Sequence, residues 1–217
     1  MELGPLFQLA APVMLKGTGY TLLFAVASMV LGLPLGGLIT LVRVLQVPLL
    51  QHVARLYVSA FRGTPLLVQV FIVYYGLPSI GIEFSPLVAG ILALTLNVAA
   101  YLSESLRGAV LGVNQGQWMA GKSLGLTHMQ TLRHVVGPQA LRFAVPSLSN
   151  SLISLIKDTS LVSVIAVTEL MLATKELIST TFQPFPLYIA AAGVYWMLSL
   201  SFERVQRGLE KRLAFPH

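Results

Sequence analysis

Long apolar segments with few charges constrain this chain more than any other feature of its sequence. Hydrophobic residues make up 55% of its 217 positions and charged residues only 10%, whereas about 25% of the residues in an average soluble protein are charged. A helix needs about 20 apolar residues to cross a bilayer. We therefore expect an all-α integral membrane protein with about five transmembrane helices and no soluble domain large enough for chemistry of its own.

Five apolar stretches are the candidate spans. They cover residues 17–42, 56–77, 86–111, 143–173 and 185–202. The first is too long for a signal peptide, lacks a small-residue cleavage site and leads into Arg43, so we expect it to remain as a span. The longest connection between spans is a polar stretch at about 112–142.

The positions of Lys and Arg predict the orientation. Eleven of the fourteen fall in or near the connection between the first two spans, the connection between the third and fourth, or the C-terminal end: Arg43, Arg55, Arg62, Arg107, Lys122, Arg133, Arg142, Arg204, Arg207, Lys211 and Arg212. Basic residues gather on the cytoplasmic side of a membrane. We expect an extracytoplasmic segment 1–16, a transmembrane domain 17–209 and a cytoplasmic tail 210–217, in a bacterial inner membrane.

Several other classes of function are excluded. The net charge of +6 does not indicate nucleic acid, because the cations stand singly between apolar runs rather than on one solvated face. The chain has no cysteine, and its four histidines lack metal-ligand spacing. Residues 116–123, GQWMAGKS, fit the P-loop pattern but follow a predicted membrane helix instead of a strand. We expect no enzyme activity, metal or cofactor on this chain.

The polar stretch between the third and fourth spans is long enough to have a function of its own. It contains helix formers, then Gly125 as a stop, and then Thr127, which can cap a second short helix with Gln130 three residues later. Such a helix could dock in a groove of a partner protein or lie on the bilayer surface.

Four separated segments resemble those of one transporter family. They are QWMAGKSLG (117–125) with VVGPQA (135–140), FRGTPLL (61–67), YLSESLR (101–107) and NSLISLIKDTSL (150–161). The first is similar to the E-A-A…G signature of binding-protein-dependent ABC importer permeases, and the others to its polar amino acid branch. The resemblance covers about residues 17–209. GLP (76–78), GIE (81–83) and SLIKD (154–158) are most similar to cystine-type permeases.

This resemblance implies the type I ABC importer permease fold, with a cytoplasmic coupling helix that sits in a cleft of a separate ATPase. The coupling residues would be Met119, Ala120, Gly121, Ser123, Leu124 and Gly125. Two ATPase copies would carry the ATP and Mg, an extracytoplasmic solute-binding protein would deliver a polar amino acid, best L-cystine, and a second permease subunit would complete a homodimer or a heterodimer. The sequence departs from the signature where Met119 replaces Glu, Gly121 replaces the second Ala and Gly137 replaces Leu.

Polar residues within the apolar stretches are the candidates for a substrate pathway, because burying them in lipid is costly. They are Asn97, Tyr101, Glu104, Asn150, Ser151, Ser154, Lys157 and Asp158. Glu104 can instead form a structural pair with Arg107, three residues away. Lys157 and Asp158 suggest a break in the fourth span, either at a substrate site, by analogy with secondary carriers, or in polar packing between helices.

Other features allow more than one interpretation. Gly32 with Gly36, and Gly108 with Gly112, have the spacing that lets membrane helices approach closely, although glycine is also simply common there. Glu169 is expected near the outer surface, where it is solvated or meets a binding protein.

Two other functions remain possible at the level of sequence. One is a self-sufficient carrier or channel that uses Glu104, Lys157 and Asp158 as relay groups. The other is a membrane-embedded assembly or scaffold protein. Five spans are few for a carrier and no internal repeat is visible, while a scaffold gives the long inner loop no role.

Overall fold

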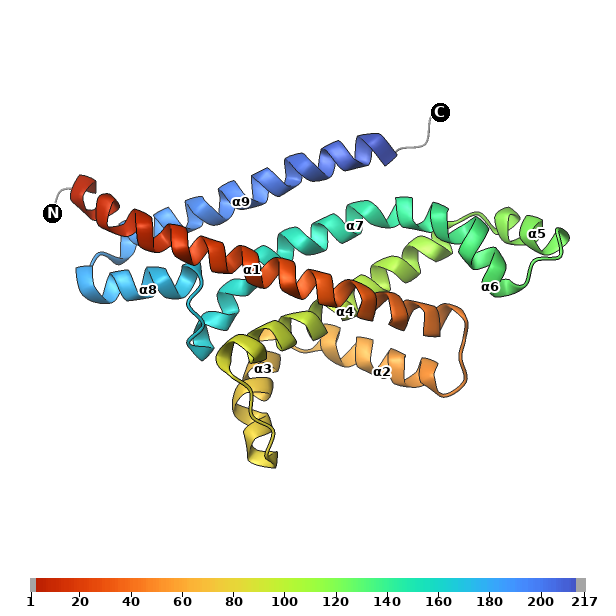
Figure 1. The fold of residues 1–217 in the computed structure, drawn as a ribbon, viewed down its shortest axis with the longest axis horizontal. Coiled ribbons are helices and arrows are strands. Elements are labelled where there is room, and N and C mark those ends of the chain that lie inside the picture. The colour runs from red at the N-terminus through yellow and green to blue at the C-terminus, as the bar shows by residue number, and fades with distance from the viewer. Residues whose placement is uncertain (1–2, 214–217) are drawn as a thin grey trace.

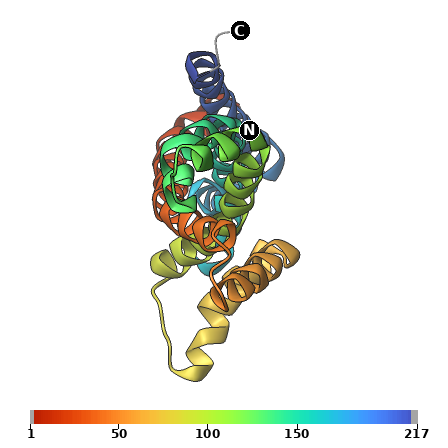
Figure 2. The same ribbon diagram turned by 90° about the vertical axis from the view of Figure 1, so that its right-hand side faces the viewer.

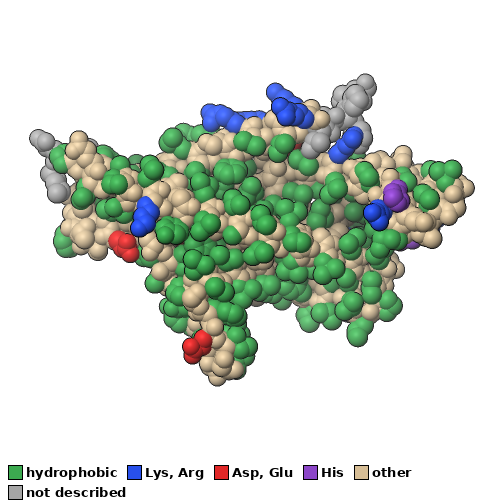
Figure 3. Space-filling model, in the orientation of Figure 1, with side chains coloured by type: hydrophobic (Ala, Val, Ile, Leu, Met, Phe, Trp, Pro, Cys, Tyr) green, Lys and Arg blue, Asp and Glu red, His purple; other side chains and the backbone are tan. Residues whose placement is uncertain are grey.

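Three long helices give the protein its length. The computed structural model describes residues 3–213, which contain no strand. In it, α1 (Leu3–Val44), α4 (Pro86–Gly112) and α9 (Pro184–Leu213) extend along the same axis of the molecule (Figure 1). Each of these three is long and apolar enough to cross a membrane alone. Hydrophobic side chains cover much of the face shown in Figure 3, and charged ones are sparse there. The all-helical membrane fold is therefore confirmed.

The second predicted span is not one straight helix. Its residues form α2 (Leu50–Gly63) and α3 (Leu66–Phe71), and the latter continues through a π turn (Ile72–Gly76) and a 3-10 turn (Leu77–Ile80). The two parts meet at 108°, and this segment projects from the bundle (Figure 2). Pro65 causes the break, because it forces Thr64 into an extended conformation, with φ −120° and ψ 147°.

The fourth predicted span is interrupted where the sequence suggested a break. α7 (Gly137–Asp158) ends at Asp158 and passes into a 3-10 helix (Thr159–Ile165). Ala166 then takes a left-handed conformation, with φ 59°, and α8 (Leu170–Thr181) follows. Polar residues along α7 make this region less apolar than the three long helices. The expected number of spans is therefore approximate: three helices of residues 3–213 qualify alone, and the bent α2–α3 pair makes a fourth.

The outer boundaries of the long helices also differ from the prediction. α1 begins at Leu3 instead of residue 17, and its first turns pack on α8 and α9 through Leu6, Ala10 and Met14. α9 continues to Leu213 instead of residue 202. A helix can continue beyond the apolar core of the membrane, because polar residues also form helical hydrogen bonds. Hydropathy alone therefore underestimates the length of a membrane helix.

α1 and α4 pack closely against each other. A Cβ atom added to Gly36 would lie 3.0 Å from the carbonyl oxygen of Ala99, and one added to Gly32 would lie 2.6 Å from Val98 Cγ1. The hydroxyl of Thr40 donates to the carbonyl of Ser103 across the same interface, at 3.0 Å. The first glycine pair therefore allows close helix approach as predicted, whereas Gly108 and Gly112 have no neighbouring element within 4 Å.

Glu169 is buried, and the expectation that it is solvated is wrong. Its Oε2 accepts hydrogen bonds from the Tyr195 hydroxyl at 2.6 Å and the Thr21 hydroxyl at 3.4 Å, while Oε1 accepts from the Leu172 N–H at 2.9 Å. The carboxylate thereby caps α8 and joins it to α1 and α9. Sequence did not reveal this role, because Thr21 lies 148 residues away along the chain.

Replacing Glu169 by alanine should lower the stability of the fold by about 2 kcal/mol, because buried donors on Tyr195 and Leu172 would lose their acceptor. The measurement is thermal unfolding in a mild detergent. Glu176→Ala is the matched control, since Glu176 lies on the same helix but is exposed. Equal midpoints for the two variants would contradict the structural role of Glu169.

Candidate functional site

A hydrogen-bond network holds the bend between α2 and α3. The side-chain amide of Gln69 donates to the carbonyl of Phe61 at 2.9 Å and to the hydroxyl of Thr64 at 2.9 Å. Its Oε1 accepts from the amide of Asn97, on α4, at 2.9 Å. Gln69 thus supplies the donors that the interrupted backbone lacks, and it fixes Asn97 beside the bend.

A cavity of about 540 Å³ opens next to this network. The bend, α4 and α7 line it with Thr64, Pro65, Leu66, Asn97, Val98, Tyr101, Ser105, Ser147, Asn150, Ser151, Ser154, Leu155 and Asp158. The cavity therefore brings together every predicted pathway residue except Glu104 and Lys157. Residues from three separate stretches of sequence meet here only because α2 bends and α7 runs against α4.

One face of α7 supplies most of the polar lining. Ser147, Ser151, Ser154 and Asp158 follow one another at helical spacing and all line the cavity. The Ser147 hydroxyl donates to that of Ser105 on α4, at 2.7 Å. Ser105 and Ser147 were missed by the sequence reasoning, although the spacing of Ser147 from Ser151 and Ser154 was a usable signal.

Asp158 is the charged residue among those that line the cavity. It ends α7, and the adjacent Lys157 is exposed and lies outside the lining. Arg62 is outside the lining, and its guanidinium lies 5.4 Å from the centre of the ring of Tyr101, a lining residue. A carboxylate, an amide and several hydroxyls can together hold a small polar molecule that carries an ammonium group.

Glu104 belongs to an ion-pair cluster instead of the cavity. It accepts from Arg43 on α1 at 2.7 Å and also pairs with Arg107, three residues further along α4. The predicted pairing with Arg107 is confirmed. Arg43 was missed, because it marks the end of a span in the sequence and its partner lies 61 residues away.

The polar stretch between α4 and α7 folds as a helical hairpin. It consists of α5 (Gln115–Ser123), α6 (His128–Thr131) and a π turn (Leu132–Val136). Gly125 reverses the chain with φ 77°, and Thr127 and Gln130 form the predicted capping box. The P-loop pattern lies within α5 and follows α4 directly, so the strand that a nucleotide site needs does not precede it.

The predicted coupling residues lie on two sides of this hairpin. Met119, Ala120, Ser123 and Leu124 are exposed, with 62% of Met119 and 79% of Leu124 accessible. Gly121 is buried, and a Cβ there would lie 2.5 Å from Thr131 Cγ2. The glycine therefore lets α5 pack on α6, while the exposed residues are free to meet another protein.

Another departure from the family signature has a local explanation. Gly137 follows the π turn, and a Cβ at this position would lie 2.6 Å from the carbonyl oxygen of Leu132. The wider turn brings that carbonyl against residue 137, so glycine fits where leucine would clash.

The family model of the binding-protein-dependent transport system inner membrane component matches residues 29–215. Among individual relatives, "Probable amino-acid ABC transporter permease protein YckA" of Bacillus subtilis is 43% identical over 94% of this chain and 90% of its own. "L-cystine transport system permease protein TcyB" of the same species is 42% identical, over 93% and 87%. "Glutamine transport system permease protein GlnP" of Escherichia coli is 36% identical, over 94% of each chain.

A solved structure has the same arrangement of helices. The crystal structure of an amino acid ABC transporter with histidines superposes with a TM-score of 0.89 at 33% identity, covering 93% of this chain and 94% of the other. The likeness therefore extends over the helical hairpin and the bent α2–α3 segment as well as the long helices.

Replacing Glu104 by glutamine should destabilise the fold by roughly 2 kcal/mol, between the values typical of exposed and of buried ion pairs. The change leaves two arginines facing each other without a carboxylate. Arg107→Gln should cost less, because Glu104 keeps its contact with Arg43. Thermal unfolding of both variants in detergent shows which of them is less stable. If Arg107→Gln were the less stable variant, the cluster would not depend on Glu104.

Proposed function

Because this chain belongs to the family of binding-protein-dependent transport system inner membrane components and is an amino-acid ABC importer permease, we propose that its polar cavity carries the substrate, a polar amino acid with L-cystine as the first candidate. The observation that carries the proposal is the convergence of Asn97, Ser154 and Asp158 on one cavity beside two helix breaks. Interrupted helices in transporters leave polar groups available to a substrate.

The cavity has the chemistry that an amino acid requires. Asp158 would hold the α-ammonium group, and the hydroxyl and amide groups of α7 would hydrogen-bond the rest of the molecule. Arg62, which lies over Tyr101 at the cavity, would attract the α-carboxylate. The choice of L-cystine is supported by the 42% identity with TcyB and by the resemblance of residues 154–158 to cystine-type permeases.

The exposed face of α5 would be the docking site for a cytoplasmic ATPase. Met119 and Leu124 offer an apolar surface, and a methionine adapts readily to a partner's cleft. Two ATPase subunits would bind ATP and Mg, and their closure would draw the coupling helices of two permease subunits together. We propose a homodimer that receives substrate from an extracytoplasmic binding protein, with the N-terminus outside and the C-terminus in the cytoplasm.

The first test changes the charge of the cavity. Asp158→Asn should reduce uptake of the transported amino acid by roughly tenfold or more, because a charge-assisted hydrogen bond to the substrate would be lost. The matched control is Lys157→Gln, a charge change of the same size and opposite sign at an adjacent exposed residue outside the cavity. Uptake of radiolabelled L-cystine and other amino acids, normalised to the membrane level of each variant, gives the measurement. Normal uptake by Asp158→Asn would remove this residue from the site.

The second test addresses docking. Met119→Asp should weaken co-purification of the ATPase roughly tenfold or more, because an unpaired carboxylate would be buried in the contact. Phe182→Asp is the control, since Phe182 is 81% exposed in the turn after α8 and its positive φ of 55° suits aspartate. If both variants retain the ATPase equally, α5 is not the docking element.

A further inference from the structure

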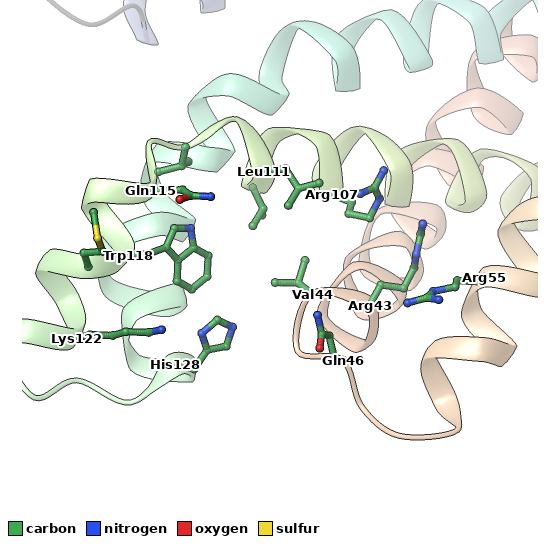
Figure 4. Close-up of a pocket in the computed structure, with 13 residues that line it drawn as sticks. Arg43, Val44, Gln46, Arg55, Arg107, Leu111, Gln115, Trp118, Lys122 and His128 are labelled. Atoms are coloured by element: carbon green, nitrogen blue, oxygen red, sulfur yellow. The ribbon is translucent and has the colours of Figure 1, made fainter.

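A second cavity, of about 720 Å³, lies between the end of α1, the end of α4 and the helical hairpin (Figure 4). Arg43, Arg55 and Arg107 lie on one side of it, and Trp118, Lys122 and His128 face them from α5 and α6. Among the described residues that line this cavity there are four Lys or Arg and no Asp or Glu. Its lining is therefore strongly basic.

The positive charge is only partly neutralised. Glu104 lies behind the lining and offsets part of the charge of Arg43 and Arg107. Arg55 donates to the side-chain oxygen of Gln51 at 3.1 Å, which carries no charge. Arg55 and Lys122 are both exposed and, in the part of the chain that the structure describes, neither forms an ion pair with a carboxylate. Both are available to an anion.

An exposed apolar stripe begins beside these cations. Val53 and Leu56 on α2 are 58% and 72% exposed, and Leu49, which precedes the helix as its N-cap residue, is 76% exposed. Leu56 directly follows Arg55 in the chain, and the stripe faces away from Arg55 around the helix. Leu111, which lines the cavity, is 67% exposed. A soluble anion needs only the basic pocket, whereas a molecule with a charged head and apolar chains fits both features.

We propose that this cavity binds the phosphate headgroup of an anionic phospholipid, whose acyl chains lie along the exposed stripe of α2. Basic pockets beside membrane helices attract anionic headgroups, and exposed apolar faces next to them enter the acyl region. Arg55 and Lys122 contact the phosphate from opposite sides. The lipid therefore bridges the α1–α2 turn and the α5–α6 hairpin.

The bridge gives the lipid an influence on the hairpin that contains the proposed coupling residues. The hairpin contributes Trp118 and Lys122 to the cavity, and Trp118 stacks on His128 with ring centres 4.7 Å apart. A headgroup bound there restrains the hairpin against α1. This inference goes beyond the proposed function, because it concerns a separate cavity and does not depend on which amino acid is transported.

The test measures binding of short-chain phosphatidylglycerol to the full chain, purified in a non-ionic detergent with the subunits that accompany it. Native mass spectrometry counts bound lipid over a titration. Arg55→Gln combined with Lys122→Gln should weaken binding about 30-fold, since each cation near an anionic headgroup contributes about fivefold. Both residues are exposed and neither holds Glu104, so the variant keeps the ion-pair cluster.

Arg204→Gln combined with Arg207→Gln is the matched control, because it removes two exposed cations of α9 that lie outside the cavity. This control should bind phosphatidylglycerol as the wild type does. The wild type and the control should each bind phosphatidylcholine at least tenfold more weakly than phosphatidylglycerol. The proposal would be overturned if the two lipids bound with equal affinity, or if the two double variants lost phosphatidylglycerol binding equally.

Two further arms identify the source of the anion. Inorganic phosphate should not displace the lipid at equal concentration; full displacement would mean a soluble-anion site and overturn the assignment. Phosphatidylglycerol should also bind when an ATPase is attached, and exclusion by the ATPase would overturn the proposal, because Met119 of the docking face also lines the cavity. A negative result in these lipid-binding measurements leaves the uptake test of Asp158 unaffected. The lipid proposal and the substrate proposal can therefore be refuted separately.

Discussion

Backbone hydrogen bonding in the absence of water is the constraint on which this architecture depends. Within a bilayer an unpaired N–H or C=O group costs several kcal/mol, so helices can be interrupted only where side chains complete the bonding. Pro65 interrupts the second span, and Gln69 compensates by donating to the carbonyls of Phe61 and Thr64 at 2.9 and 3.1 Å. The bend is therefore stable because one glutamine serves three acceptors, with Asn97 holding that glutamine in place.

The polar cavity follows from this arrangement. A straight second span would pack its apolar face along α4 and leave no space beside Asn97. The bend instead places Thr64 and Pro65 opposite the polar face of α7, and the 3-10 helix after Asp158 ends that face at the same depth. Two interruptions far apart in sequence thus define one space, and the groups that stabilise them also line it.

The sequence was sufficient for several features whose signal is local. The apolar stretches, the capping box of Thr127, the turn at Gly125 and the end of α7 at Asp158 all depend on residues a few positions apart. Asn150, Ser151, Ser154 and Asp158 of α7 were found for the same reason, since their helical spacing is visible in the sequence, whereas Ser147 on the same helix was missed.

What sequence reasoning missed was long-range. The burial of Glu169 requires Thr21 and Tyr195 to come together, and the pairing of Arg43 with Glu104 requires α1 to pack on α4. The bend at Pro65 had a local signal, but the apolar run continues across it, so hydropathy gave a single span. Hydropathy measures how well a segment tolerates lipid, and it contains no information on the direction of the chain.

α7 connects the helical hairpin to the polar cavity. It begins at Gly137, directly after the π turn of the hairpin, and ends at Asp158 in the cavity, so its 22 residues extend over about 33 Å. A long helix transmits displacement along its axis because its hydrogen bonds resist stretching, and tight packing passes small shifts on to its neighbours. A displacement of α5 is therefore passed to the polar face of α7 along this helix, although Pro146 removes one backbone hydrogen bond near its middle. α1 and α4, joined at Gly36 and by the Thr40–Ser103 hydrogen bond, form the frame against which α7 can move.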